Sequence, residues 1–342
     1  MTPYSQLRSL PRLELAQAVP LDKPLTLYVE VTNRCNLKCR MCPESHTDYA
    51  KIAGGIRTMN LDNLLMVAHR VIEIGGVKTM YLHSLGEPML NPRTPDFIKA
   101  VRPHVERICL TTNGTVPMTK LLDCPPDYVR VSVYGNSHEE FRYVTQSEVD
   151  HRRVLDNVRD LWDARNGRAK LLGGPGPGYY LLPFIYVKGF SNFPLLMHRF
   201  GPYADEVDTE PVMNWNGEDN WQVVGRDADI PTSKRACPAP FYIMCIHADL
   251  RVSMCGVDWS KRLVVGDLHD QSLLEIWQGT DAHNVRVAHL AGERCKLDGC
   301  RTCTYLDTTL PDDIDALSEG EYLNRVRARS VAKAEETFTG VA

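Results

Sequence analysis

Three cysteines with a spacing suited to metal chemistry lie near the N-terminus, at Cys35, Cys39 and Cys42. The spacing, C-x3-C-x2-C, folds three thiolates around one face of a cubic four-iron, four-sulfur (4Fe–4S) cluster. Such a cube normally takes four cysteine ligands, so three leave one iron free for a substrate. An open position on a metal distinguishes a reactive site from a structural one. The loop therefore predicts a catalytic iron–sulfur centre.

A zinc-binding loop is the alternative for the same three cysteines. Zinc usually takes paired C-x2-C blocks, or a C-x2-C block together with H-x3-H. A tight loop of three cysteines without a nearby fourth ligand fits zinc poorly, so we favour the iron–sulfur cluster.

The cysteine loop resembles that of radical S-adenosylmethionine (radical SAM) enzymes, in which the free iron binds the methionine part of SAM. One residue departs from the usual pattern: Met41 stands where many members have an aromatic residue near the adenine. Methionine can cover a purine face with its polarisable thioether, so the departure is compatible with the family.

The same resemblance implies SAM contacts elsewhere in the chain. A Gly-Glu-Pro turn exposes the backbone carbonyls of Gly86 and Glu87 to the SAM ammonium group. Asn113 follows the third predicted strand, and Ser132 and Arg142 would meet the ribose or carboxylate of SAM. A guanidinium suits a carboxylate because its planar fork matches two oxygens. Taken alone, Gly-Glu-Pro and Asn-Gly are turn signals, and Arg142 could be a solvated helix residue.

A second group of cysteines lies towards the C-terminus. Cys237 and Cys255 flank a predicted hairpin over 242–254, and Cys300 and Cys303 form a C-x2-C pair. This order resembles the SPASM and shorter twitch domains of radical SAM proteins, and implies one auxiliary 4Fe–4S cluster on these four cysteines. Leu250 stands where the family's hairpin usually has glycine, which changes the turn but removes no ligand. A structural zinc is the alternative, because an all-thiolate site also suits zinc.

Four cysteines remain outside these two groups. Cys109 is interpreted as a small buried apolar residue, and Cys124 lies at a strand entrance. Cys245 falls within the hairpin and Cys295 near the C-x2-C pair. Either could be the thiol that returns a hydrogen atom, which is what separates a radical epimerase from a dehydrogenase.

The composition limits the class of protein. The chain has 342 residues, 43% hydrophobic and 24% charged, and a formal charge of −4 that gives no support for a nucleic-acid partner. We find no signal peptide and no apolar run of about 18 residues, so nothing is expected to span a membrane. Eleven cysteines without a secretory signal indicate metal ligation in a reducing cytoplasm.

Apolar alternation predicts six strands, over 25–31, 77–84, 107–112, 128–134, 181–188 and 206–212. Helical periodicity intervenes, notably over 150–165 and over 61–74. We place on one face of the latter helix Leu61, Leu64, Leu65, Ala68, Val71 and Ile72. Alternating strands and helices imply an α/β fold with a parallel sheet. The resemblance makes this a partial (β/α)6 TIM-like barrel with a small C-terminal, cluster-binding twitch/SPASM-like domain.

We divide the chain into four parts on this basis: an N-terminal extension at 1–23, the radical SAM partial barrel at 24–229, the auxiliary-cluster domain at 230–310 and a C-terminal helical tail at 311–342. Chemistry is expected on the loops that follow the C-terminal ends of the barrel strands.

The family resemblance implies the reaction type and the cofactors, which are SAM and two 4Fe–4S clusters. A flavodoxin- or ferredoxin-type reductant would supply the electron that cleaves SAM. The resulting 5′-deoxyadenosyl radical removes a hydrogen atom from a C–H bond, while the protein orients the reactants and excludes water. Dehydrogenation of an alcohol to a ketone, or epimerisation, would follow. We favour dehydrogenation, because the loops after Cys124 that we assign to barrel strand ends carry no spare thiol.

The substrate class is the least determined point. Peptide-modifying relatives carry a leader-binding domain before the barrel, and the first strand here begins near Leu25. This favours a polyol or sugar, as in the twitch enzymes of aminoglycoside and oligosaccharide antibiotic pathways. Candidate contacts at the barrel rim are Lys188, Asp208, Glu210, Asn214, Trp215 and Glu218. The alternatives are a peptide-modifying (RiPP) maturase with a separate leader-binding partner, and a non-catalytic zinc or iron–sulfur scaffold.

Overall fold

The structure is a computed structural model that describes residues 13–171, 183–189, 192–209, 234–301, 303, 305–308 and 312–339. Its strands form one nine-stranded sheet in the order β6-β5-β4-β3-β2-β1-β7-β8-β9. The first six strands are parallel, as predicted. They are β1 (Thr26–Val29), β2 (Val77–Tyr81), β3 (Val105–Thr112), β4 (Tyr128–Val133), β5 (Phe184–Gly189) and β6 (Glu206–Thr209).

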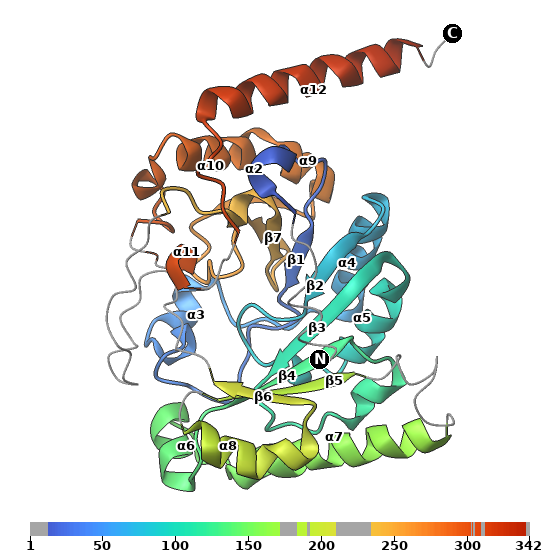
Figure 1. Cartoon of the computed structure of the whole chain (residues 1–342), viewed down its shortest axis with the longest axis vertical. Coiled ribbons are helices and arrows are strands. Elements are labelled where there is room, and N and C mark those ends of the chain that lie inside the picture. Colours follow the sequence, from blue (N-terminus) through green and yellow to red (C-terminus); the bar gives the residue numbers. More distant parts are fainter. Residues whose placement is uncertain are drawn as a thin grey trace.

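Helices cover the outer side of this curved sheet (Figure 1). The longer ones are α4 (Leu61–Glu73), α5 (Thr94–Val101), α6 (His138–Thr145), α7 (Arg152–Leu171) and α8 (Phe193–Phe200). Alternate strand residues such as Leu27, Ile108 and Val131 pack with helix residues in the main hydrophobic core. The intervening residues therefore point to the concave inner side. The result is the predicted partial (β/α)6 barrel.

Helix α4 shows how local sequence sets the boundaries of an element. The Asn60 side chain caps its first turn by accepting the Asn63 N–H at 2.9 Å. Gly75 and Gly76 end it with φ of 67° and 78°, values that suit glycine. Lys23 then donates to the carbonyls of Ile74, Gly75 and Gly76.

The prediction of which α4 residues form its buried apolar face is partly wrong. Leu61, Leu65 and Ile72 are 40%, 49% and 44% exposed. Its buried residues are Leu64, Val67, Ala68 and Val71. The apolar stripe is wider than the contact with the sheet, so the residues at its edges stay in solvent.

The C-terminal part extends the barrel sheet instead of forming a separate one. Strand β7 (Ile243–Ile246) pairs in parallel with β1, on the side opposite β2. Strands β8 (Arg251–Ser253) and β9 (Val264–Asp267) follow antiparallel, and the first of them completes the predicted hairpin. Helices α9 (Leu273–Gln278) and α10 (Thr280–Leu290) come next, then the short α11 (Tyr305–Thr308).

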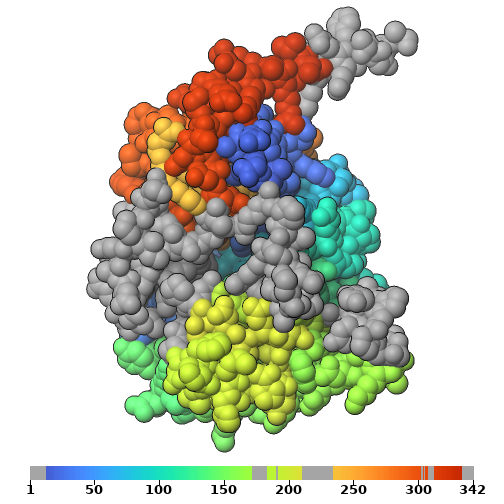
Figure 2. All heavy atoms as spheres, in the orientation of Figure 1, coloured from blue at the N-terminus to red at the C-terminus, as the bar shows by residue number. Residues whose placement is uncertain are grey.

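The C-terminal α12 (Glu319–Thr339) passes beside α2 (Leu15–Ala18) at the top of the molecule (Figure 2). Arg325 of α12 donates to the carbonyls of Ala16, Gln17 and Val19. Among the described residues, no helix combines the length and apolar character that a membrane span requires. A further short helix, α3 (Tyr49–Ile52), follows the cysteine loop.

The β7–β8 turn contains a strained leucine. Leu250 has φ of 68°, a left-handed value, although its side chain is fully buried. Its N–H donates to the His247 carbonyl at 2.8 Å, which closes the turn. A three-residue hairpin loop needs such a left-handed residue, usually glycine. Leucine at position 250, where the family usually has glycine, therefore preserves the turn but leaves its own backbone strained.

We expect Leu250→Ala to be less stable than Leu250→Gly by about 1 kcal/mol, although glycine is the smaller residue. Both changes remove a buried side chain, at a cost of about 2–5 kcal/mol, but only glycine relieves the left-handed strain of about 1–2 kcal/mol. Urea unfolding of the two variants measures the difference. An alanine variant as stable as the glycine variant would show that the turn is unstrained.

Candidate active site and auxiliary metal centre

The cysteine loop follows β1 directly, and the structure brings its three thiols together. Burial, and for Cys39 also the proximity of Cys35 and Cys42, raises the pKa of these thiols, to about 12 for Cys35. The Leu37 N–H points at the Cys35 sulfur from 3.5 Å. Buried thiols that face one another and accept N–H donors are suited to bind a metal as thiolates.

The Gly-Glu-Pro turn after β2 is packed against this loop. Gly86 has φ of 75°, and a Cβ added to it would lie 2.3 Å from the Thr32 carbonyl oxygen. The Glu87 N–H donates to the Arg34 carbonyl at 2.9 Å. Only glycine fits this close approach, so Gly86 and Glu87 lie beside the predicted cluster, where SAM contacts are expected.

Glu87 also connects the turn to Asn113 at the end of β3. Its buried carboxylate accepts the Asn113 N–H at 2.6 Å and the Thr112 hydroxyl at 2.7 Å. Burial raises the pKa of Glu87 to about 7, and these donors oppose the rise. The Asn113 amide in turn donates to Asn36 at 3.0 Å and points at the Cys35 sulfur from 3.8 Å. Asn113 therefore lies at the cluster loop.

The two SAM contacts predicted near β4, Ser132 and Arg142, lie in different surroundings. Ser132 is buried on the inner side of β4 and hydrogen-bonds Tyr134, whose pKa is raised by burial and by the nearby loop cysteines. The Arg142 side chain is 59% exposed on α6 and pairs with Glu148 at 2.9 Å. The structure does not bring Arg142 to the other residues, and its SAM carboxylate role stays a prediction. Sequence reasoning missed Tyr134.

Gly86→Ala is expected to weaken SAM binding by about tenfold or more. The new Cβ would clash with the Thr32 carbonyl and hold alanine in a left-handed conformation, which costs about 1–2 kcal/mol. Gly167→Ala is the matched control, because nothing lies within 4 Å of its added Cβ. Equilibrium dialysis with labelled SAM measures both. Equal affinity in the two variants would place SAM away from this turn.

The four C-terminal cysteines predicted as ligands line one cavity. Cys237, Cys255, Cys300 and Cys303 surround it, together with Leu263, His289, Arg294 and Tyr305. Burial and the proximity of the other cysteines raise the pKa of Cys237, Cys255 and Cys300, to about 12 for Cys237. The Tyr305 N–H donates to the Cys303 sulfur at 3.4 Å. The set therefore fits a second metal centre, as the C-x2-C pair predicted.

Two residues at this cavity were missed from the sequence. His289 of α10 is fully buried, its ring contacts Cys237 and Cys300, and burial lowers its pKa to about 4. Arg294 donates to the carbonyls of Cys300 and Cys303 at 2.9 and 3.2 Å. A single histidine or arginine carries no spacing signal, so only the fold reveals these contacts.

The Cys300→Ala/Cys303→Ala double variant should lower the iron content from about eight to about four per chain, because only one cluster would remain. Cys295→Ala is the control, since Cys295 is exposed and does not line the cavity. Iron, sulfide and zinc analysis of anaerobically purified protein measures the result. An unchanged iron content in the double variant, or a loss in the control, would contradict the ligand assignment.

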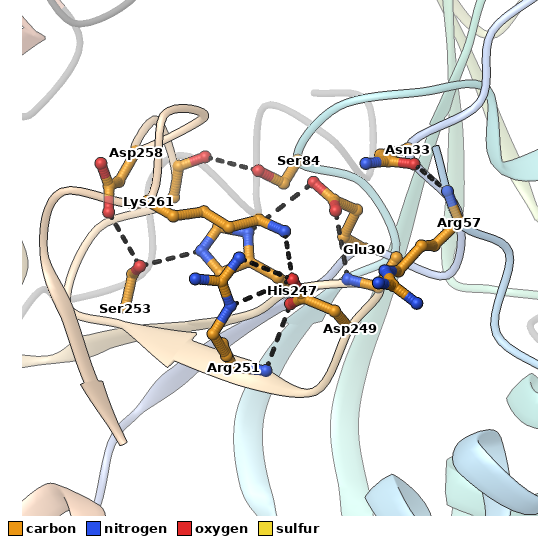
Figure 3. Close-up of polar contacts among 12 residues, drawn as sticks. Glu30, Asn33, Arg57, Ser84, His247, Asp249, Arg251, Ser253, Asp258 and Lys261 are labelled. Carbon is orange, nitrogen blue, oxygen red and sulfur yellow. Dashed lines mark hydrogen bonds and ion pairs between the residues drawn. The ribbon is translucent and has the colours of Figure 1, made fainter. Parts of the chain in front are cut away.

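A buried polar network joins the two centres (Figure 3). Glu30 at the end of β1 lies 3.9 Å from the His247 ring, which contacts the Ser253 hydroxyl at 2.8 Å. Ser253 donates to Asp258 at 2.8 Å. Ser84, beside the Gly-Glu-Pro turn, donates to the Gly256 carbonyl at 3.0 Å. These contacts fix the auxiliary hairpin against the barrel, because buried polar groups are stable when they are hydrogen-bonded.

The inner side of the barrel carries two layers of different chemistry. The lower layer is mostly aromatic and runs in register across six strands as Cys245, Tyr28, Tyr81, Cys109, Tyr128 and Phe184. The next inward-facing positions form a polar layer, which contains His247, Glu30, His83, Thr111, Arg130, Tyr186 and Glu206. A polar layer above an aromatic floor is suited to hold a small polar molecule.

The predicted rim residues are only partly described. Lys188 is buried in β5 beside Asp208 of β6, both facing inward. Glu210, Asn214, Trp215 and Glu218 lie outside the described residues. Cys245 is fully buried in the floor layer, whereas Cys295 is exposed. The structure does not bring these two thiols together.

Comparison with known families agrees with this geometry. The model of the radical SAM superfamily matches residues 29–177, and the model of the SPASM iron–sulfur cluster-binding domain matches residues 237–304. The chain belongs to the radical SAM superfamily and carries a C-terminal SPASM domain. Membership brings SAM with one 4Fe–4S cluster, and the SPASM domain brings further iron–sulfur binding.

Curated relatives match only part of the chain. The tungsten-containing aldehyde ferredoxin oxidoreductase cofactor-modifying protein of Pyrococcus furiosus is 30% identical over 96 residues, 28% of this chain and 26% of that protein. The GTP 3′,8-cyclase of Clostridium perfringens is 32% identical over 136 residues, 39% of this chain and 40% of the enzyme. The matches span well under two thirds of either relative.

Solved structures share the fold along nearly the whole chain. BtrN in complex with AdoMet and 2-DOIA has a TM-score of 0.56 at 17% identity, covering 85% of this chain and 97% of BtrN. The enzyme anSMEcpe with bound AdoMet has a TM-score of 0.51 at 15% identity, covering 92% and 96% of the two chains. At these identities the likeness concerns the fold alone.

Proposed function

We propose that this radical SAM enzyme dehydrogenates a secondary alcohol of a small carbohydrate or aminocyclitol to a ketone. The polar layer inside the barrel is the observation that carries the proposal. It offers acidic, basic and hydroxyl groups at one level, such as Glu206, Arg130 and Tyr186. A polyol matches such a surface, because each hydroxyl both donates and accepts a hydrogen bond. The neighbour BtrN was solved with AdoMet and 2-DOIA, which is compatible with a small-molecule substrate.

In this proposal the cysteine loop holds the SAM-binding cluster, and the four C-terminal cysteines hold the auxiliary cluster. The bound cluster and SAM together supply a radical that takes a hydrogen atom from the substrate carbon. Asn113 and the Gly86–Glu87 turn, which lie beside the cysteine loop, would orient SAM there. Ser132 lies on the same inner side of β4, level with Lys188 of β5, and can contact both SAM and the substrate.

His83 is the proposed acceptor of the hydroxyl proton. Its ring lies on the inner side three residues before Gly86, edge-on to Tyr28 and Tyr81. Nε2 contacts the Thr111 hydroxyl at 3.3 Å, and Nδ1 has no hydrogen-bond partner among the described residues. Burial and the Arg130 charge hold the pKa of His83 well below its usual value. The imidazole is therefore neutral at pH 7, and the accepting role rests on Nδ1, unpartnered in the described part of the chain, since the lowered pKa by itself makes the ring a weaker base.

A chain of contacts links the inner side of the barrel to the auxiliary centre, the proposed acceptor of the electron that leaves the substrate radical. Tyr28 of the floor layer hydrogen-bonds Tyr305, and the Tyr305 N–H donates to the Cys303 sulfur. Conversion of the alcohol carbon to a ketone would then balance: one hydrogen atom would leave with the SAM-derived fragment, one proton would go to His83, and one electron would go to the cluster that the four C-terminal cysteines would hold.

The exposed position of Cys295 favours dehydrogenation over epimerisation, whereas Cys245 in the floor layer stays a candidate hydrogen donor. Epimerisation needs a thiol that faces the substrate radical. Cys245 lies in the floor, one layer below His247, and Cys295 is in the exposed turn Arg294–Lys296. The alternative substrate is a peptide, which the enzyme would modify with the help of a separate leader-binding partner.

Anaerobic turnover in heavy water with SAM, reductant, inositols, amino-inositols and amino sugars tests the proposal by mass spectrometry. We expect a product that lacks two hydrogens, formed in equal amount with 5′-deoxyadenosine. His83→Asn should keep hydrogen abstraction and lose about 10²–10⁴-fold in ketone formation, with partial rescue by added imidazole. A product of unchanged formula that carries one carbon-bound deuterium would instead establish an epimerase.

A further inference from the structure

His289 occupies an unusual position at the auxiliary cavity. It lies in the last turn of α10 and has no exposed surface. The backbone N–H of Cys237 points at its Nδ1 from 3.2 Å. Its Nε2 lies 3.6 Å from the Cys300 sulfur. The ring therefore bridges two of the four cysteines that line the cavity.

The hydrogen-bond partners determine the tautomer of this ring. A backbone amide can only donate, so Nδ1 must be the acceptor in its contact with Cys237. A neutral imidazole has one accepting and one donating nitrogen, so Nε2 carries the hydrogen. That hydrogen is directed at the Cys300 sulfur. Nε2 then has no lone pair for a metal, which makes His289 a hydrogen-bond donor and not a fifth ligand.

A hydrogen bond to a ligand sulfur changes the redox behaviour of an iron–sulfur cluster. The N–H withdraws electron density from the thiolate, which stabilises the reduced cluster and raises its reduction potential. Arg294 adds a positive charge nearby, held by the carbonyls of Cys300 and Cys303. Both groups therefore favour the reduced state of a cluster bound in this cavity.

We propose that His289 is a positioning residue that donates its Nε2 hydrogen to Cys300 and raises the reduction potential of the auxiliary cluster. The inference rests on the proposed function for the ligand role of Cys300, and not on the identity of the substrate. It gives the C-terminal centre the property that an electron acceptor in dehydrogenation needs.

Redox titration of the anaerobic holoprotein, followed by electron paramagnetic resonance, tests the inference. His289→Leu should lower the auxiliary potential by about 59 mV, a tenfold change for one electron. His289→Gln can still donate from its amide and should restore part of the shift. His283→Leu is the matched control on the same helix, since His283 stacks on Tyr322 and does not line the cavity. An unchanged potential in the leucine variant at full iron content would overturn the inference.

A second measurement on the wild-type protein holds even if the leucine variant loses its cluster. Pulsed electron paramagnetic resonance of the reduced auxiliary cluster should show weak imidazole nitrogen coupling and an exchangeable proton from the Nε2–H, in addition to that of the Tyr305 N–H. Strong coupling typical of a ligated imidazole would overturn the donor role. If the potential of the auxiliary cluster depends on His289 but the enzyme forms no ketone, the inference about His289 stands and only the proposed dehydrogenase function is refuted.

Discussion

The parallel pairing of β1 with β7 is the contact on which both metal centres depend. Strand β1 leads directly into the loop of Cys35, Cys39 and Cys42, and β7 begins the hairpin that ends near Cys255. The pairing joins segments about two hundred residues apart, as in the bond from the Ala248 N–H to Glu30. Because the two centres share one sheet, their separation is set by strand spacing and not by a flexible linker.

Buried polar groups then make this arrangement specific. Glu30, His247 and Asp258 are each about 1% exposed, and each would be costly to bury without its partners. A shift in the register of β7 would separate Glu30 from His247 and from the Ala248 N–H that donates to it. Gly86 restricts the geometry at the cluster loop by a different means, since only a residue without a side chain fits there. These contacts explain how loops that bind metals can be held to a single geometry.

Much of the fold could be predicted because it depends on local patterns. Alternation in β1 to β5 and the glycine stop after α4 predict the correct elements, and the cysteine spacings predict the two groups of thiols that the structure brings together. The pairing of β7 with β1 could not be predicted, since no local signal indicates which distant strand is the neighbour. His83 and His289 were missed for a related reason. A single histidine has no periodicity, and its chemistry appears only when Thr111 or Cys300 is placed beside it.

Mössbauer spectroscopy of isotopically enriched anaerobic protein, recorded with and without SAM, tests the central claim most directly. The central claim is that one sheet positions two clusters, a reactive one with an open iron and a second one that is fully ligated. We expect about eight irons in 4Fe–4S form, with SAM changing the signal of one iron in one cluster only. Two clusters that both respond to SAM, or a C-terminal site filled by zinc, would contradict the account.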